Sequence, residues 1–133
     1  MARRVNPERE VENRIRDFFY DPLGYVYYAF DWDNPPLNEL GGPDEWQRDI
    51  LETLGENLRA QDSGLKMPVK VAVSSGHGIG KSALMCWIVL WWMSTRPKSP
   101  VVVTANTGDQ LETKTWRELS LWHERAINSH WFE

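Results

Sequence analysis

Residues 75–82, Ser-Gly-His-Gly-Ile-Gly-Lys-Ser, decide how this chain is expected to fold. They follow the β-branched run 69–73, Val-Lys-Val-Ala-Val, and precede the strongly apolar run 83–93. This order predicts a strand, a glycine loop and a helix. Glycines let consecutive backbone N–H groups point inward, and the N-terminus of a helix adds partial positive charge. The stretch therefore predicts a phosphate-binding P-loop.

The loop has an expected role for each part of a bound nucleotide. Lys81 would reach the β- and γ-phosphates as the catalytic charge, and the hydroxyl of Ser82 would bind magnesium. The usual pattern has glycine where this chain has Ser75, so either Gly76 takes over the turn or Ser75 adopts it with some strain. A glycine-rich turn without a ligand is the alternative interpretation. The expected nucleotide-binding residues of the loop are Ser75, Gly76, His77, Gly78, Ile79, Gly80, Lys81 and Ser82.

The composition is that of a globular protein. The chain has 133 residues, of which 41% are hydrophobic and 26% charged, and its net charge of −4 argues against a surface built for a standing grip on DNA. Cys86 is the single cysteine, which excludes an internal disulfide and fits a reducing, cytoplasmic setting. The longest apolar run, 83–93, falls short of the roughly 20 residues that span a bilayer, so no membrane association is expected. The helical spacing of the tryptophans favours packing over base stacking.

The pattern along the chain predicts an α-helical N-terminal lead at residues 1–40 and the N-terminal part of a P-loop ATPase domain at 41–133. A second short apolar strand is expected at 101–104. Two strands joined through a helix imply a right-handed crossover and a parallel sheet, with the ligand at the carboxyl ends of the strands. The predicted fold class is therefore α/β, an incomplete P-loop NTPase fold behind a helical lead. Helices are expected at about 7–19, 23–30, 43–60, 83–95 and 109–126.

Two further segments bear on nucleotide binding. The amide of Gln47 both donates and accepts hydrogen bonds, so it can pair with the edge of adenine. A surface glutamine on an amphipathic helix is the alternative. Small polar residues at 104–110 follow the second expected strand. They would lie near the γ-phosphate, or would form an N-capping turn.

In their order along the chain, these segments resemble the ATPase part of the large terminase subunit of tailed bacteriophages, the motor that packages DNA into the capsid. The likeness covers nearly the whole chain and includes a variant Walker A loop. The matching segments are Asp21-Pro22-Leu23-Gly24 with Tyr27-Tyr28-Ala29-Phe30, Gly42-Pro43 with Trp46-Gln47, residues 74–82, Thr104-Ala105-Asn106-Thr107 with Gln110, residues 114–119, and His130-Trp131-Phe132-Glu133.

The resemblance implies ATP hydrolysis that drives DNA translocation, with ATP and Mg²⁺ as cofactors. Gln47 would contact adenine, residues 76–82 the phosphates, and Ser82 the magnesium ion. The implied partners are double-stranded DNA, the terminase small subunit, the portal protein and further copies of the full-length chain, in the cytoplasm of a bacterial host. Many family members carry an arginine, in some proposed as an arginine finger, where this chain has His77. Either His77 takes over that role or it shapes the loop.

The sequence lacks the acidic residues that this chemistry needs. Phosphoryl transfer uses a carboxylate on a further strand to hold magnesium, and no apolar run ends in Asp-Glu here. No carboxylate cluster of a two-metal nuclease follows. We therefore expect an N-terminal fragment or a truncated product, which binds ATP weakly at best and hydrolyses almost none. Another P-loop ATPase such as a helicase, or a catalytically silent remnant, are the alternatives, and the reading frame after Glu133 would separate the three.

Overall fold

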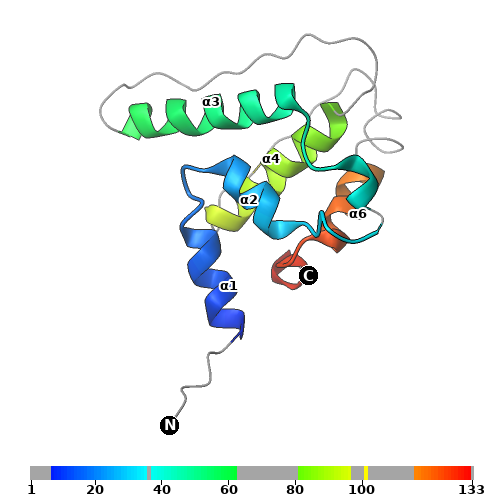
Figure 1. The fold of residues 1–133 in the computed structure, drawn as a ribbon. Coiled ribbons are helices and arrows are strands. Elements are labelled where there is room, and N and C mark those ends of the chain that lie inside the picture. The colour runs from blue at the N-terminus through cyan, green and yellow to red at the C-terminus, as the bar shows by residue number, and fades with distance from the viewer. Residues whose placement is uncertain (1–6, 36, 63–80, 97–100, 102–115, 133) are drawn as a thin grey trace.

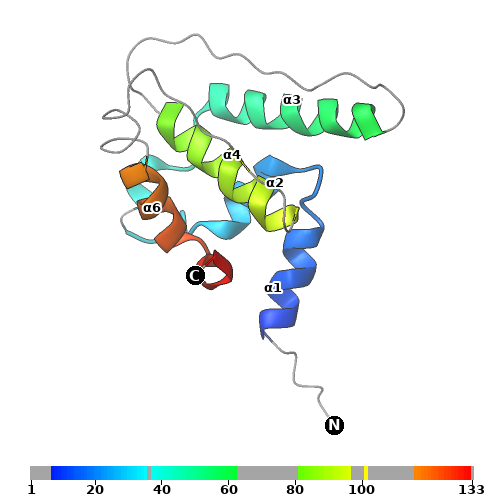
Figure 2. The ribbon, with the colours of Figure 1, turned by 180° about the vertical axis from the view of Figure 1, so that it is seen from behind.

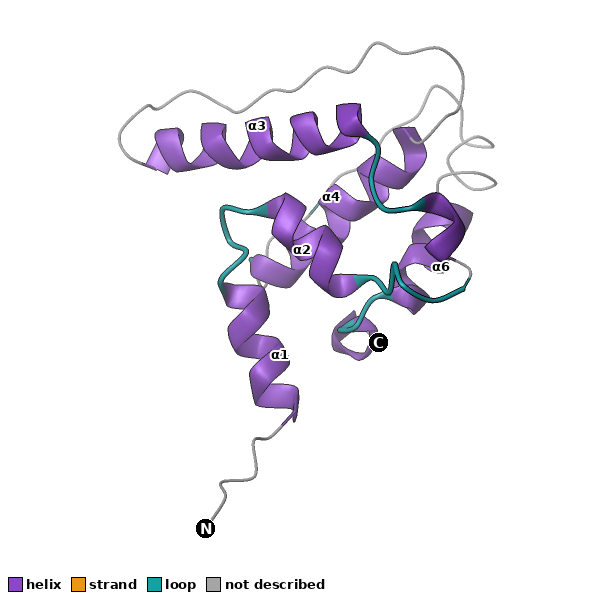
Figure 3. Cartoon of the chain, viewed as in Figure 1, coloured by secondary structure: helices purple, strands orange, loops and turns teal. Residues whose placement is uncertain are grey.

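The computed structural model describes residues 7–35, 37–62, 81–96, 101 and 116–132 (Figure 1). Within these ranges the chain forms α-helices and short 3-10 helices, and no described residue belongs to a strand (Figure 3). In chain order the elements are α1 (Pro7–Arg16), α2 (Pro22–Ala29), η1 (Leu37–Leu40), α3 (Glu45–Asp62), α4 (Lys81–Thr95), α6 (Trp116–Arg125) and η3 (Ser129–Phe132).

The predicted α/β fold, an incomplete P-loop NTPase with a parallel sheet, is wrong, because the described structure is helical. Val101 is the one described residue of the two expected strands, and it lies outside any strand. The expected strand 69–73 and residues 102–104 lie outside the described residues. A helix satisfies its backbone hydrogen bonds internally, whereas a strand needs paired neighbours, and two strands alone are marginal. A β-branched run by itself therefore does not establish a sheet.

The start of α2 agrees with the sequence. Asp21 caps the helix, since the backbone N–H of Gly24 donates to its Oδ1 at 2.9 Å, and Pro22 occupies the first turn. The preceding helix α1 was predicted to reach Phe19, but it ends at Arg16 and gives way to a turn over 17–20. This turn brings the chain round from α1 into α2.

Helix α4 is the centre of the structure and contacts α1, α2 and α6. It passes behind α2 in Figure 1 and in front of it in the reverse view of Figure 2. Because it is surrounded, it is apolar on most of its sides, as the sequence predicted. None of the helices among the described ranges is both long and apolar enough to cross a bilayer. The buried residues of α4 are Ala83, Leu84, Cys86, Trp87, Val89, Leu90, Trp91 and Ser94.

The C-terminal end of α4 holds the turn between α1 and α2. The indole Nε1 of Trp91 donates to the carbonyl oxygen of Phe18 at 2.6 Å, and Nη2 of Arg96 donates to that of Phe19 at 3.1 Å. The Arg96 guanidinium also lies 3.7 Å from the centre of the Phe19 ring. Hydrogen bonds and cation–π contact thus act on the same turn.

A buried polar network joins α2, α4 and the segment after α6. The side chain of Asn128 is fully buried, and its Nδ2 donates to Ser94 Oγ at 2.8 Å. The hydroxyl of Tyr25 donates to Asn128 Oδ1 at 3.3 Å, while Ser94 Oγ donates to the carbonyl oxygen of Leu90 at 2.6 Å. Burial raises the pKa of Tyr25 to about 12, against a smaller opposing effect of its hydrogen bonds with Ser94 and Asn128. The network links α2 and α4 with the turn after α6, three segments that lie far apart in the sequence.

Helix α3 packs against α2, and its Gly55 lies close to the backbone that leads into α2. A Cβ atom on Gly55 would collide with the backbone carbonyl oxygen of Tyr20 and would lie 3.1 Å from Pro22 Cδ. Glycine is a weak helix former, so its place in the middle of α3 is explained by this close approach.

Candidate functional site

The predicted site residues fall partly within the described structure. Gln47 lies in the first turn of α3, and Lys81 and Ser82 are the first two residues of α4. The sequence predicted a helix from about residue 83, and α4 begins close to this point, at Lys81. The side chains of Lys81 and Ser82, and the whole of residues 75–80, lie outside what the structure describes.

Gln47 is buried and takes part in capping α3. Its Oε1 accepts a hydrogen bond from the backbone N–H of Asp44 at 2.8 Å, and Arg48 N donates to the carbonyl oxygen of Asp44 at 2.9 Å. This is the pattern of a capping box, in which the third helical residue reaches back to the capping residue. With 4% of its surface exposed, Gln47 is not the surface glutamine of the alternative interpretation.

A cavity of about 260 Å³ lies between the start of α3 and the start of α4. Sites for drug-sized ligands occupy roughly 300–1,000 Å³, so this volume suits one ring system better than a complete nucleotide. The structure brings Gln47 to the same cavity as Ala83, which follows Lys81 and Ser82 in α4. The residues that line the cavity include Trp32, Gln47, Ala83, Trp87, Glu118 and Trp122.

Three tryptophans from different segments form the aromatic wall of this cavity. The ring centres of Trp87 and Trp122 are 5.3 Å apart and those of Trp32 and Trp87 are 5.7 Å apart, with interplanar angles of 86° and 84°. These are the edge-to-face arrangements that aromatic quadrupoles favour. Sequence analysis treated these residues as packing, because helical spacing does not reveal which tryptophans meet.

Among the buried polar side-chain atoms of the described residues, Nε1 of Trp87 is the one that has no hydrogen-bond partner. By contrast, Nε1 of Trp32 donates to the carbonyl oxygen of Val26 at 3.0 Å. Leaving a buried donor unpaired costs about 1–3 kcal/mol. Sequence reasoning missed Trp87, since nothing in the apolar run 83–93 separates it from its neighbours.

Carboxylates also line the cavity. Asp44 borders it at the start of α3, and Glu118 borders it from α6. Glu118 acts on its surroundings: its negative charge adds to the effect of burial, which raises the pKa of Cys86 to about 12. Two carboxylates disfavour phosphate and favour N–H donors, so the cavity suits an amine-bearing ring rather than the phosphates of a ligand.

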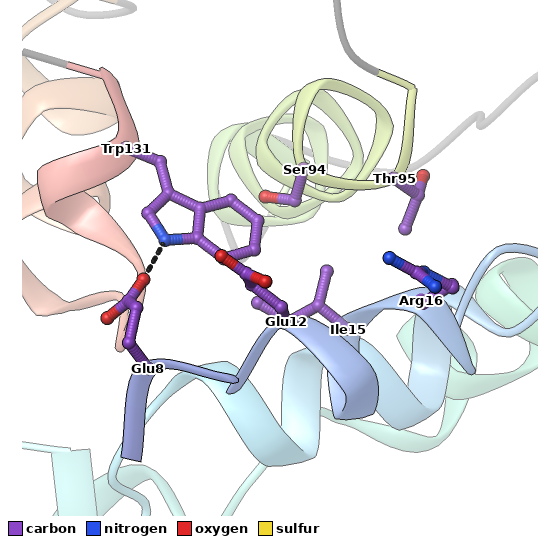
Figure 4. A pocket seen from close by; sticks show the side chains of 7 residues that line it. All are labelled: Glu8, Glu12, Ile15, Arg16, Ser94, Thr95 and Trp131. Carbon is purple, nitrogen blue, oxygen red and sulfur yellow. Dashed lines mark hydrogen bonds between the residues drawn. The ribbon is translucent and has the colours of Figure 1, made fainter. Parts of the chain in front are cut away.

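A second cavity, of about 480 Å³, lies between α1, the end of α4 and η3 (Figure 4). Glu8 and Trp131 point toward each other across it, and Trp131 Nε1 donates to Glu8 Oε1 at 2.7 Å. This bond, followed by that of His130 at 2.9 Å, lowers the pKa of Glu8. Ser94 belongs to the buried network already described. The bonds of Glu8 with Trp131 and His130 hold α1 against η3 beside this cavity.

The predicted magnesium site stays a prediction. Within the described ranges, no three His, Cys, Asp or Glu side chains gather as a metal site, and the Ser82 hydroxyl is not among the described atoms. No family model, curated protein or solved structure matches this chain. The function is therefore argued from the residues themselves.

Proposed function

We propose that this chain binds ATP, as the nucleotide-binding part of a DNA-packaging motor of the terminase large-subunit kind. One observation carries the proposal: Gln47, the residue expected to contact adenine, lines the same cavity as Ala83. Ala83 lies in the first turn of α4, directly after Lys81 and Ser82. A base in this cavity would lie beside a helix N-terminus, where partial positive charge favours phosphate.

The groups around the cavity fit an adenine base. Its size suits a single ring system, its lining includes three tryptophans, and the carboxylates of Asp44 and Glu118 would accept hydrogen bonds from the amine of the base. Outside the cavity, Lys81 would pair with the phosphates, and Ser82 would help hold Mg²⁺, which would neutralise phosphate charge. The backbone of residues 75–80 would complete the phosphate site. This proposal needs the glycine loop and the start of α4, and it does not need a sheet.

The wider role rests on the resemblance of the ordered segments. We propose that the complete motor hydrolyses ATP to move double-stranded DNA, as a homo-oligomer that contacts the terminase small subunit and the portal protein. Its place would be the cytoplasm of a bacterial host.

Isothermal titration calorimetry of the chain with ATP in the presence of Mg²⁺ tests the proposal. Lys81→Ala is expected to weaken ATP binding by about tenfold or more, because it removes a charge-assisted bond to phosphate. Lys98→Ala makes the same charge change after the other end of α4 and is expected to bind like the wild type. Absence of saturable binding in the wild type, or equal binding by Lys81→Ala, would show the proposal to be wrong.

A second variant separates adenine recognition from capping. Gln47→Glu keeps an oxygen that accepts from Asp44 N–H, and glutamate is as suitable as glutamine in a capping box. It loses the amide donor and adds a negative charge. Because Gln47 is buried, the added charge is expected to lower stability by about 1–3 kcal/mol, so ATP affinity is compared on protein whose folding is checked by circular dichroism. ATP affinity is expected to fall, whereas that for inorganic triphosphate is expected to stay the same.

A further inference from the structure

We infer that the cavity between α1, the end of α4 and η3 binds a small zwitterion of the α-amino acid kind, with its ammonium group at Glu12 and its carboxylate at Arg16. The inference does not depend on nucleotide binding, because the proposed function concerns the other cavity. The volume of about 480 Å³ lies within the range of sites that hold small molecules.

The first argument is that two opposite charges on α1 do not pair with each other. Glu12 precedes Arg16 by four residues, which is the spacing and the order in which such side chains usually form an ion pair on a helix. No ion pair or side-chain hydrogen bond joins either of them to another described residue. Figure 4 shows Glu12 directed toward Trp131 and Arg16 under Thr95, and no hydrogen bond joins the two charges. A ligand that carries both charges would supply both counterions.

The second argument is that the other polar groups in the described lining of the cavity are already bonded within the protein. Glu8 accepts from Trp131 Nε1 at 2.7 Å and pairs with His130 at 2.9 Å. The hydroxyls of Ser94 and Thr95 donate to carbonyl oxygens one turn earlier in α4, at 2.6 and 2.8 Å. The two unpaired charges of α1 are therefore the groups that this lining leaves for a ligand.

The third argument is the character of the surface around the two charges. Because Glu12 points toward the ring of Trp131, an ammonium group there would meet a carboxylate and an aromatic ring, both of which attract a cation. The guanidinium of Arg16 has N–H groups in a fork that matches a carboxylate. Ile15 adds apolar surface to the wall. An amino acid with an apolar or aromatic side chain, such as phenylalanine, complements these features.

The experiment titrates the chain with phenylalanine and with two analogues that each lack one charge. Phenethylamine has no carboxylate, and hydrocinnamate has no ammonium group. Binding is followed by NMR through the indole N–H signal of Trp131 in protein with isotope-labelled tryptophan, and Trp131→Phe assigns the signal. For the wild type, we expect saturable binding of phenylalanine that is about three- to fivefold tighter than that of either analogue, as for ion pairs partly exposed to solvent.

Two variants test the two ends of the ligand separately. Glu12→Gln should bind phenylalanine and hydrocinnamate alike, because the ammonium group no longer has a counterion. Arg16→Gln should bind phenylalanine and phenethylamine alike, because the carboxylate no longer has one. Glu10→Gln and Arg9→Gln are the matched controls: they make the same charge changes on α1, away from the cavity lining, and should keep the preferences of the wild type. All four side chains are exposed, so the fold is expected to stay intact.

Three results would overturn the inference. The first is the absence of a saturable shift of the Trp131 signal with phenylalanine. The second is equal affinity of the wild type for phenylalanine and either analogue, as expected from stacking on Trp131 alone. The third is an unchanged preference in Glu12→Gln or Arg16→Gln. Because this titration contains no nucleotide, its failure would leave the ATP proposal standing, and the failure of ATP binding would leave this inference standing.

Discussion

Tyr25→Phe should change the sign of its effect on stability between neutral and alkaline pH. Near neutral pH the substitution removes the hydroxyl that donates to Asn128 Oδ1 at 3.3 Å within the buried network. Leaving that buried acceptor without its donor is expected to lower the free energy of unfolding by about 1–1.5 kcal/mol. Tyr25 is fully buried, so no discount for solvent is needed.

At alkaline pH the hydroxyl of wild-type Tyr25 lowers the stability of the folded chain. Burial raises its pKa from 10.0 to about 12, so between these values the unfolded chain loses a proton that the folded chain keeps. Stability therefore falls as pH rises through this window, by about 1.4 kcal/mol per pKa unit once the unfolded state is ionised. The loss from this residue is about 1.4 kcal/mol at pH 11 and about 2.3 kcal/mol at pH 12. Phenylalanine has no such loss, so the two stability curves should cross near pH 11.

Urea unfolding of the wild type and Tyr25→Phe at a series of pH values measures this crossing. Other titrating groups affect both proteins alike and cancel in the difference. Ser94→Ala is the control: it weakens the same network without removing a titrating group, so it should be less stable than the wild type at every pH. A difference between wild type and Tyr25→Phe that keeps one value from pH 8 to pH 12 would refute the reasoning, because Tyr25 would then titrate as an exposed tyrosine.

Three further predictions concern packing and reactivity. Gly55→Ala should lower the free energy of unfolding by about 1–3 kcal/mol in thermal unfolding, because the added Cβ would collide with the carbonyl oxygen of Tyr20 and outweigh the better helix propensity of alanine. A stabilised variant would contradict the packing of α3 on α2. Arg96→Lys should cost about 1–2 kcal/mol in urea unfolding, since lysine cannot both stack on Phe19 and bond its carbonyl oxygen, and an unchanged midpoint would argue against that contact. Burial raises the pKa of Cys86 to about 12, so iodoacetamide at pH 8 should label this thiol only after urea has unfolded the chain. Rapid labelling of the native protein would contradict the burial of Cys86.

The signals that start and stop a helix are local, and those of α2 and α4 agreed with the structure, whereas α1 ended at Arg16 and not at the predicted Phe19. Asp21 and Pro22 begin α2 because a side-chain cap and a fixed φ act within one turn. Helix α4 starts at Lys81 and stops at Thr95, shortly before Pro97, as expected from a proline beyond the helix end. The sheet prediction failed because strand pairing depends on partners elsewhere in the chain, about which the run 69–73 says nothing.

The candidate site likewise contains one residue that the sequence indicated and one that only the tertiary structure shows. Gln47 was proposed to contact adenine because of its amide chemistry and the family resemblance, and the structure added its bond to Asp44. Trp87 gave no signal at all, since a tryptophan in an apolar run is most often a packing residue. Its unpaired Nε1 becomes visible only after α4 and its neighbours are assembled.

From the order of its residues alone, this chain determines that α2 begins at Asp21-Pro22, that a helix begins close to Lys81, and that this helix is apolar on most of its sides. Each of these depends on interactions between residues a few positions apart. Tertiary structure alone decided that the described part is a helical assembly, that Gln47 and Ala83 share a cavity, and that Trp87 lies there with an unpaired donor. Such features arise where segments remote in sequence pack together, and no local pattern records which of them meet.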